Sequence, residues 1–344
     1  FETQKISKKG NFGLYLKTAI MFAMYIVPYW QLLTGNYNDW QSLIWIVVMA
    51  VGTAGIGLSV MHDANHGTYS ENKWVNLIMG ESLTMIGGNS YTWKIQHNVL
   101  HHTYTNVYGH DEDVDTKFLI KLSKNAKTRW YHKYQHVYAW LLYGLLTVAF
   151  LFKDFRQMYT FNKAGYYKNN GTSAIFEVIR LLITKSFYVF YIIIVPIFYF
   201  NIPVHKVLIG FFLMHLITGF ILSTVFQLAH IMEDTEHPLP DEDGKLENVW
   251  AEHQLKTTCN FSNKNKLVTW YTGGLNHQIE HHLFPTICHV HYPAISKIVK
   301  ETAKEFGLPY YEYENMFVAL RSHVNTLKEI GHAQPSPQAL AVMA

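Results

Sequence analysis

Residues 43–66 read LIWIVVMAVGTAGIGLSVMHDANH, and this stretch constrains the fold of the whole chain. Its first part, Leu43 to Met61, is almost entirely apolar and carries no charged side chain. A helix that spans a membrane needs about 20 residues of this kind. The stretch then ends in His62 and His66, which are four residues apart and would share one face of a helix. A membrane helix therefore carries a pair of imidazoles to the membrane surface.

The composition of the whole chain supports a membrane protein. Of its 344 residues, 49% are hydrophobic and only 15% are charged, whereas soluble domains average about 25% charged residues. The net charge of +3 gives no reason to expect a nucleic-acid partner. Two cysteines, Cys259 and Cys288, are too few for a disulfide framework or a cysteine-rich zinc site. The chemistry of the chain must therefore come from other side chains.

Four segments are long and apolar enough to cross a membrane, and they form two hairpins. Short polar turns link the first to the second and the third to the fourth, the latter at Asn201 to Pro203. The predicted spans are residues 14–33, 43–61, 181–200 and 204–229.

A fifth apolar segment, about 137–152, is shorter than a usual span and has basic residues on both flanks. Because positive charge marks the cytoplasmic side, we expect it to dip into the membrane or lie along it. Both termini and all histidine clusters then share the cytoplasmic face. The predicted fold is an all-α integral membrane protein, a single domain over 1–344. Its helical cytoplasmic cap comprises residues 62–180 and 230–333, and residues 334–344 form a flexible tail.

Three histidine clusters lie at the edges of these apolar segments. The first is His62–His66, and the second places His97 four residues before His101 with His102 adjacent. The third ends in the adjacent pair His281 and His282. Neighbouring residues of a helix point about 100° apart, so an adjacent pair suits two neighbouring ions better than one. A structural zinc takes four ligands, and these clusters offer more. They therefore predict two metal ions.

Further residues complete the predicted site. His230 ends the fourth span, where a histidine is a functional candidate. Either Gln278 or His277 could complete the third cluster. Ligating histidines usually donate their second N–H to a carboxylate. We expect Asp63 and one of Asp111 and Asp113 to have this role.

Taken together, the clusters resemble the three histidine boxes of the membrane fatty acid desaturases, in order and spacing over nearly the full chain. The third, Gln278-Ile279-Glu280-His281-His282, lies between Gly273-Gly274-Leu275-Asn276 and Leu283-Phe284-Pro285. It is similar to the box of front-end desaturases, which insert a double bond between an existing one and the carboxyl end. Two features depart from the family pattern: the sequence shows no fused cytochrome b5 motif, and His277 stands where a tyrosine is usual.

The resemblance implies a di-iron centre of two Fe²⁺ ions, with oxygen as co-substrate. Zinc has no redox state to offer such chemistry. It further implies an external electron donor of ferredoxin or cytochrome b5 type, and a fatty acyl-CoA or acyl-lipid substrate in the bilayer. Candidate residues for the lining of the substrate channel are Thr92, Trp93, Trp270 and Tyr271.

Other functions share some of these features. Fatty acid and alkane hydroxylases carry similar boxes, although the glutamine of the third box favours desaturation. A zinc hydrolase of the membrane would need only about three ligands and an open position. A metal transporter would place its histidines within the spans rather than at their ends. The sequence leaves open the acyl carrier, the position of the double bond and the oligomeric state.

Overall fold

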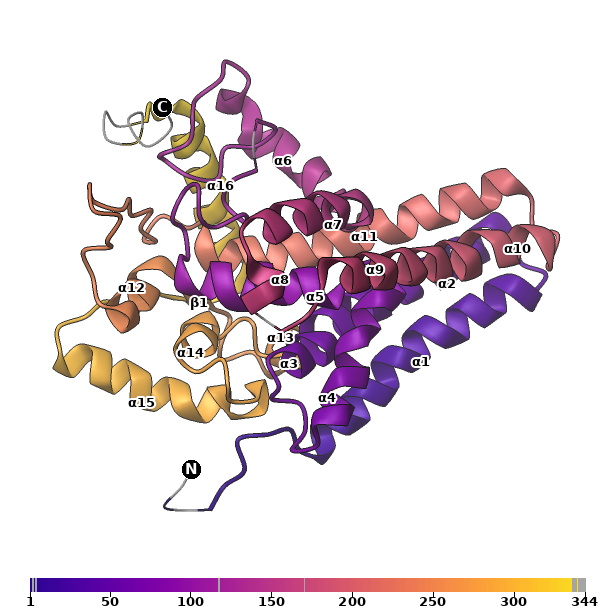
Figure 1. Ribbon diagram of the computed structural model, residues 1–344, viewed down its shortest axis with the longest axis horizontal. Coiled ribbons are helices and arrows are strands. Elements are labelled where there is room, and N and C mark those ends of the chain that lie inside the picture. Colours follow the sequence, from indigo (N-terminus) through magenta and orange to yellow (C-terminus); the bar gives the residue numbers. More distant parts are fainter. Residues whose placement is uncertain (2, 4, 117, 170, 336–338, 340–344) are drawn as a thin grey trace. The chain divides into compact units, whose positions relative to one another are not determined.

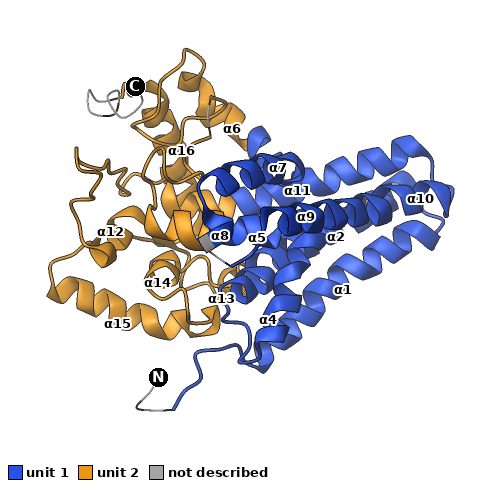
Figure 2. Ribbon diagram, viewed as in Figure 1, with its two compact units in different colours: residues 1–95, 141–223 blue, residues 96–140, 224–344 orange. Residues whose placement is uncertain are grey.

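The computed structural model describes residues 1–344 except 2, 4, 117, 170, 336–338 and 340–344. It is mostly helical (Figure 1). The chain divides into two compact units (Figure 2). Unit 1 comprises residues 1–95 and 141–223, and unit 2 comprises residues 96–140 and 224–344. The prediction of one domain stays a prediction, and most of the predicted tail lies outside the described residues.

All four predicted spans are present as helices long and apolar enough to cross a membrane. They correspond to α1 (Phe12–Thr34), α2 (Asp39–Gly55) with its continuation to Asn65, α9 (Ala174–Val189) with its continuation to Phe198, and α11 (Val204–His230).

Several of these helices begin earlier than the hydrophobic pattern predicts, because polar residues cap them. The side chain of Asn38 accepts a hydrogen bond from the N–H of Gln41, and the side-chain Oε1 of Gln41 accepts one from the N–H of Asn38. Ser173 accepts from the N–H of Phe176 and starts α9 seven residues before the predicted boundary of 181. A cap supplies partners for N–H groups that lack them in the first turn, so a helix extends to it beyond its apolar part.

Two spans contain π-helical segments. The second span passes from α2 into η1 (Ile56–Met61) and then α3 (His62–Asn65). The third passes from α9 into η5 (Phe190–Ile194) and α10 (Val195–Phe198). Pro196, which lacks a backbone N–H, lies two residues after the end of η5, as expected for a helix that a proline disrupts.

The remaining helices of unit 1 connect the spans. They are α4 (Lys73–Gly80), the 3₁₀-helix η2 (Glu81–Ile86), α5 (Ser90–Trp93), α7 (Leu146–Lys163) and α8 (Tyr166–Asn169). The predicted membrane-dipping segment falls on α6 (Gln135–Gly144) and the start of α7. Its two parts are bent by 75°, as in a broken span or a re-entrant loop.

The elements of unit 2 are short and carry most of the histidines. The π-helix η3 (Lys94–His101) enters it, and η4 (His132–Tyr134) precedes α6. The others are α12 (Trp250–Thr257), α13 (Lys266–Tyr271), α14 (Gln278–Leu283), η6 (His289–His291), α15 (Tyr292–Glu305) and α16 (Met316–His332).

A small sheet corrects the all-α prediction. Strands β1 (Asn260–Phe261) and β2 (Glu312–Tyr313) pair in parallel, with Asn260 opposite Glu312 and Phe261 opposite Tyr313. Strands of two residues have too few positions to show an alternating pattern, so sequence periodicity could not reveal them.

Candidate metal centre

Unit 2 holds two overlapping groups of buried histidines. The first is His101, His230 and His282, and the second is His102, His281 and His282. Within each group, the candidate ligand atoms all lie within 4.8 Å of one another. The rings of the adjacent pair 101–102 are inclined by 76°, and those of 281–282 by 90°. The ring planes of each adjacent pair thus differ in orientation, and the site of two ions stays a prediction.

Three elements bring these histidines together within unit 2. The π-helix η3 carries His97 and His101, whose rings stack at a centroid distance of 5.2 Å. The short helix α14 carries His281 and His282. His230 is the last residue of α11. The second cluster lies in a π-helix rather than the α-helix assumed from its spacing, and π-helical turns are often found at functional sites.

A buried carboxylate orients His101. Its Nδ1 lies 3.0 Å from Oδ2 of Asp111, which is fully buried. Burial alone would lower the pKa of His101, but the charge and hydrogen bond of Asp111 outweigh burial and raise it. Asp113 is 42% exposed and lies farther away, at 3.5 Å from the same nitrogen. Of the two carboxylates predicted for this role, Asp111 therefore makes the closer contact.

Asn106 connects several parts of the site, and sequence reasoning did not single it out. Its N–H donates to Oδ2 of Asp111 at 3.0 Å. Its side-chain Nδ2 lies 2.9 Å from the carbonyl oxygen of His230 and 3.2 Å from that of Thr257. Its φ of 61° is in the left-handed region, which asparagine tolerates better than most residues. No spacing in the sequence indicates such a residue, because its partners lie far apart along the chain.

The tautomer of His282 follows from the hydrogen bonds of Gln254. Nε2 of Gln254 donates to the carbonyl oxygen of His102 at 3.2 Å, so its Oε1 is the acceptor. Nδ1 of His282 lies 2.7 Å from this Oε1 and must carry the proton. Among the described residues, Nε2 of His282 has no hydrogen-bond partner. This nitrogen therefore presents a lone pair to the interior of the site.

The hydroxyl of Thr105 supports the same arrangement. It donates to the carbonyl oxygen of His101 at 2.7 Å and lies 3.0 Å from Oε1 of Gln254. Burial keeps the pKa of His282 well below its usual value, and the electrostatic effect of the nearby histidines lowers this pKa further. His282 is thus neutral, the form in which imidazole binds metal. Neither Thr105 nor Gln254 belongs to a recognisable motif, so no pattern in the sequence indicates them.

Of the two alternatives for the third cluster, Gln278 lies nearer to the histidines. Its side-chain Nε2 is 3.0 Å from Nε2 of His230, and its buried Oε1 has no hydrogen-bond partner among the described residues. His277 belongs to none of the candidate metal groups found in the described part of the chain. It lies beside Glu280, with 3.7 Å between Nδ1 and Oε2.

Glu280 itself faces away from the histidine groups. The hydroxyl of Tyr310 donates to Oε1 of Glu280, and Nδ2 of Asn260 donates to Oε2, both at 2.8 Å. Oδ1 of Asn260 also accepts from the N–H of Ile279, which fixes the start of α14. These contacts hold the helix that presents the two histidines of the third box.

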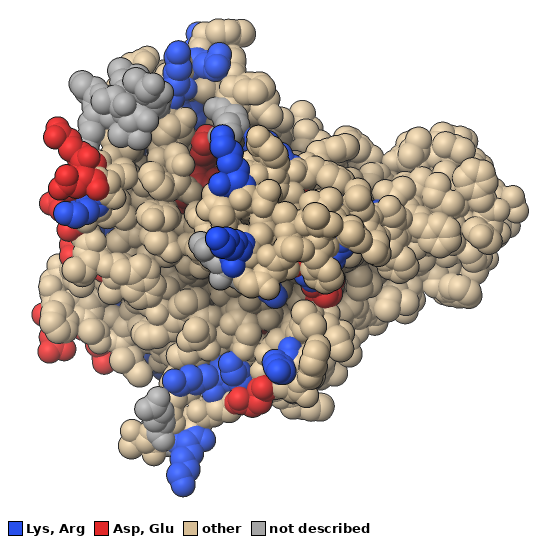
Figure 3. Space-filling model, in the orientation of Figure 1, with Lys and Arg blue, Asp and Glu red and all other residues tan. Residues whose placement is uncertain are grey.

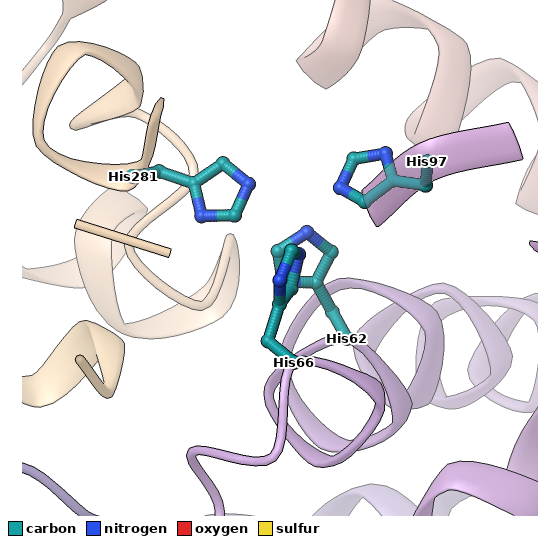
Figure 4. Close-up of side chains that lie close together, drawn as sticks. All are labelled: His62, His66, His97 and His281. Carbon is teal, nitrogen blue, oxygen red and sulfur yellow. The ribbon is translucent and has the colours of Figure 1, made fainter. Parts of the chain in front are cut away.

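His97 and His281 lie next to each other in unit 2, with rings stacked at a centroid distance of 5.8 Å (Figure 4). Nδ1 of His281 lies 3.2 Å from the hydroxyl of Tyr292, the first residue of α15. Tyr292 is a further residue that the sequence did not reveal.

The first box lies in unit 1. The rings of His62 and His66 extend from the same end of the second span, with a centroid distance of 4.7 Å (Figure 4). Trp93, predicted to line a substrate channel, packs edge-on against both rings at 5.6 and 5.9 Å. Asp63 is buried, and its supporting role stays a prediction.

The other residues predicted for the channel have different surroundings. Thr92 is fully buried and donates to Oδ1 of Asp154 at 2.9 Å. Asp154 in turn pairs with Lys185 at 2.6 Å. Trp270 is 39% exposed on α13, where Tyr271 is the last residue. Their assignment to a channel stays a prediction.

The donor set of unit 2 fits metal ions. His101, His230, His281 and His282 each direct Nδ1 to a protein partner, for His230 the carbonyl oxygen of Thr257 at 3.4 Å. Ligating histidines characteristically engage one ring nitrogen in this way and bind the metal with the other. A set of buried imidazoles with one amide oxygen suits iron, copper or zinc.

Comparisons with known proteins agree with this chemistry. The family model described as "Fatty acid desaturase" matches residues 38–314. A sn-1 linoleoyl-lipid 6-desaturase from Arthrospira platensis is 37% identical over 96% of this chain and 89% of its own length. One with the same description from Synechocystis sp. is 34% identical over 97% of this chain and 92% of its own. An acyl-lipid (8-3)-desaturase from Physcomitrium patens is 36% identical over 96% of this chain and 69% of its own.

Proposed function

Because the chain belongs to the fatty acid desaturase family, we propose that it is a front-end desaturase that introduces a double bond into the acyl chain of a membrane glycerolipid. Membership of the family makes it an oxidoreductase. The relatives described above, named for desaturation of linoleoyl-lipid or acyl-lipid, support the substrate class. They do not favour a hydroxylase, and coenzyme A is the second candidate for the acyl carrier.

One observation carries the proposal. Two groups of buried imidazoles share His282, and within them His101, His230, His281 and His282 direct Nδ1 to protein partners. Such an arrangement supports two neighbouring ions within unit 2. A zinc hydrolase would need only one ion and about three ligands.

We assign the ligands of two iron ions from these groups and from the boxes of the family. His101, His230, His282 and Gln278 would serve one ion, and His102 and His281 would serve the other. His97, His62 and His66 complete the set, on the strength of the family pattern and the close spacing of each pair of rings. Asp63 and Asp111 are the proposed supporting carboxylates, Asp113 is the less favoured alternative to Asp111, and His277 is not included.

The bound ions would supply the activation of oxygen and the electron transfer that an unreactive methylene pair requires. Overall, the acyl chain loses two hydrogens, and two further electrons and two protons enter from outside. One molecule of oxygen then leaves as two of water. An external ferredoxin or cytochrome b5 would supply the electrons.

The residues of the chain itself prepare the site for this reaction. Asp111 balances positive charge at His101 from a position that water does not reach. Gln254 holds one tautomer of His282 before any metal arrives. Since the histidines are buried, solvent does not compete for the nitrogens that would bind metal.

The proposed topology places both termini and all three boxes on the cytoplasmic side, with residues 62–180 and 230–333 as the cap. The four span helices support an even number of crossings. The 75° bend between α6 and α7 supports a segment that enters the membrane and returns, rather than a fifth span. The basic residues on both of its flanks point to the same side.

The test is the fatty acid profile of cells that express the chain together with a ferredoxin or a cytochrome b5 and are fed linoleate. Gas chromatography with mass spectrometry should show a new double bond on the carboxyl side of the existing ones, mainly in the glycerolipid fraction. His281→Ala should abolish the product. His332→Ala is the matched control, because His332 lies at the exposed end of α16 and, among the described residues, hydrogen-bonds to the carbonyl of Lys328 in its own helix.

Three outcomes would contradict parts of the proposal. A hydroxylated product would assign the chain to hydroxylation. A product confined to the acyl-CoA pool would change the acyl carrier. Purified protein with one zinc and no iron per chain would refute the di-iron assignment.

A further inference from the structure

A cavity of about 430 Å³ lies among the span helices of unit 1, apart from the three histidine boxes. Its walls come from α1, α2, η5, α10 and α11, with His205 among the polar lining residues. Most of the side chains are apolar, including Leu33, Leu43, Ile46, Ile192, Leu213 and Met214. Its size is within the range of small-molecule sites, which are likewise mostly apolar with a few polar groups. We propose that this cavity binds one acyl chain of a zwitterionic phospholipid, as a lipid site separate from the site of reaction.

The surroundings of the cavity indicate an acyl chain rather than water. The same helices expose large apolar side chains, such as Trp40 at 77%, Ile44 at 61% and Ile209 at 57%. On the face that Figure 3 shows, the part formed by the spans carries few charged side chains. The neighbours of these helices are therefore lipid chains. Water does not fill an apolar cavity, because it finds no hydrogen-bond partners there, whereas a lipid chain gains packing contacts.

The charges beside the cavity indicate the headgroup. Residues 31–43 and 196–210 together contain one carboxylate, that of Asp39, and one ammonium group, that of Lys206. Both line the cavity and pair at 2.9 Å, with side chains 88% and 50% exposed. An exposed pair of this kind contributes little stability, so a headgroup can separate its members. A phosphate would then bind Lys206, and the headgroup ammonium would bind Asp39.

The site is distinct from the metal centre. Met49 is the lining residue of α2 nearest to the first box, and thirteen residues separate it from His62. At 1.5 Å per residue of helix this is about 20 Å. The proposal needs only that the spans lie in a membrane, so it does not depend on the desaturase activity.

Gly210 offers a way to fill the cavity. It is a lining residue, and a Cβ atom there would lie 3.3 Å from Cδ1 of Ile46, so a larger side chain would enter the space between α11 and α2. Gly210→Leu is the first variant. Leu213→Trp is the second, in case the first does not fold. Phe220→Leu is the matched control, because Phe220 is a 43% exposed residue of the same helix outside the cavity lining.

The experiment uses the full chain in phosphatidylcholine vesicles that contain a trace of phosphatidylcholine with a photoreactive acyl chain. After illumination, mass spectrometry maps the labelled peptides. We expect labelling to concentrate at Leu213 and Met214 over Phe212 and Phe220, and to fall about tenfold in the variants that fill the cavity. Phe220→Leu should label as the native chain does.

Further arms of the experiment identify the ligand. A photoreactive phosphatidylglycerol and a photoreactive free fatty acid should each label the cavity about tenfold less, and Lys206→Gln should remove the preference for phosphatidylcholine. Equal labelling of cavity and outward-facing residues, or no effect of either filling variant, would overturn the site. Equal labelling by the other two probes would overturn the assignment of the headgroup. Iron content and desaturation product, measured on the same samples, report separately on the proposed function.

Discussion

Replacing Asp111 by asparagine is expected to weaken iron binding by ten- to one-hundredfold, the usual effect of removing a group that supports a metal-ligating histidine. Asp111 is fully buried and accepts three hydrogen bonds. Oδ2 receives those of His101 Nδ1 and Asn106 N–H, and Oδ1 receives that of Asp113 N–H, each at 3.0 Å.

The number of lost bonds sets the size of the effect. An asparagine can keep its oxygen toward His101 and Asn106 only if its amide nitrogen faces the N–H of Asp113. One bond is then lost, and a buried donor faces another donor, at a cost of about 1 to 3 kcal/mol. The negative charge beside His101 is also removed. Together these effects correspond to about 1.4 to 2.7 kcal/mol of iron-binding free energy.

The assay is competition for iron between the purified protein and a chelator of known affinity. Asp113→Asn is the matched control, because Asp113 is half-exposed and lies 3.5 Å from the same nitrogen. Its effect should be about fivefold at most, as for an exposed pair. Thermal unfolding of the metal-free proteins reports whether each variant folds. A folded Asp111→Asn protein with native iron affinity, or an equal loss in Asp113→Asn, would refute the reasoning.

Other perturbations test other contacts. Gln254→Leu removes the acceptor that selects the tautomer of His282. It should lower the iron content per chain, with a loss of iron affinity of about tenfold. Gln254→Glu keeps the acceptor and should retain more iron. Asn106→Ala should lower the free energy of unfolding by about 3 kcal/mol, since buried carbonyl groups lose their donor, and Asn106→Gly, which keeps the left-handed backbone without strain, should separate the backbone from the side-chain effect. Burial lowers the pKa of His323 to about 4, so the unfolded chain binds a proton that the folded chain excludes. The metal-free protein should therefore lose stability as the pH falls from about 6.5 to about 4, and His323→Gln should flatten that dependence in thermal unfolding measured across pH. Removal of iron by a chelator should lower the melting temperature of the native chain more than that of His281→Ala.

The spans could be predicted because their signal is local. Each needs only a continuous apolar run, and residues 43–61 show it without reference to any other part of the chain. The histidine boxes are local in the same sense, since the members of each box lie within a few residues of one another. The helix starts were less accurate because single polar residues, Asn38 and Ser173, determine them.

The supporting residues could not be predicted because their partners are distant in sequence. Gln254 contacts His102 and His282 from a separate helix. Asn106 joins carbonyl groups more than a hundred residues away. Nothing in the letters around either residue distinguishes it from an ordinary polar side chain. Only the tertiary structure selects them.

The π-helical segment η1 (Ile56–Met61) has a consequence for insertions and deletions. Its hydrogen bonds reach five residues along the chain instead of four, so this wide turn absorbs one residue more than an α-helix would. A deletion of one residue within 56–61 can convert the turn to a regular α-helix and leave His62 and His66 on the same face. A deletion within 43–55 has no such reserve, and would rotate both histidines by about 100° around the helix axis. The second span thus has a short interval in which its length can change without rotating His62 and His66, the proposed metal ligands, to another face of the helix.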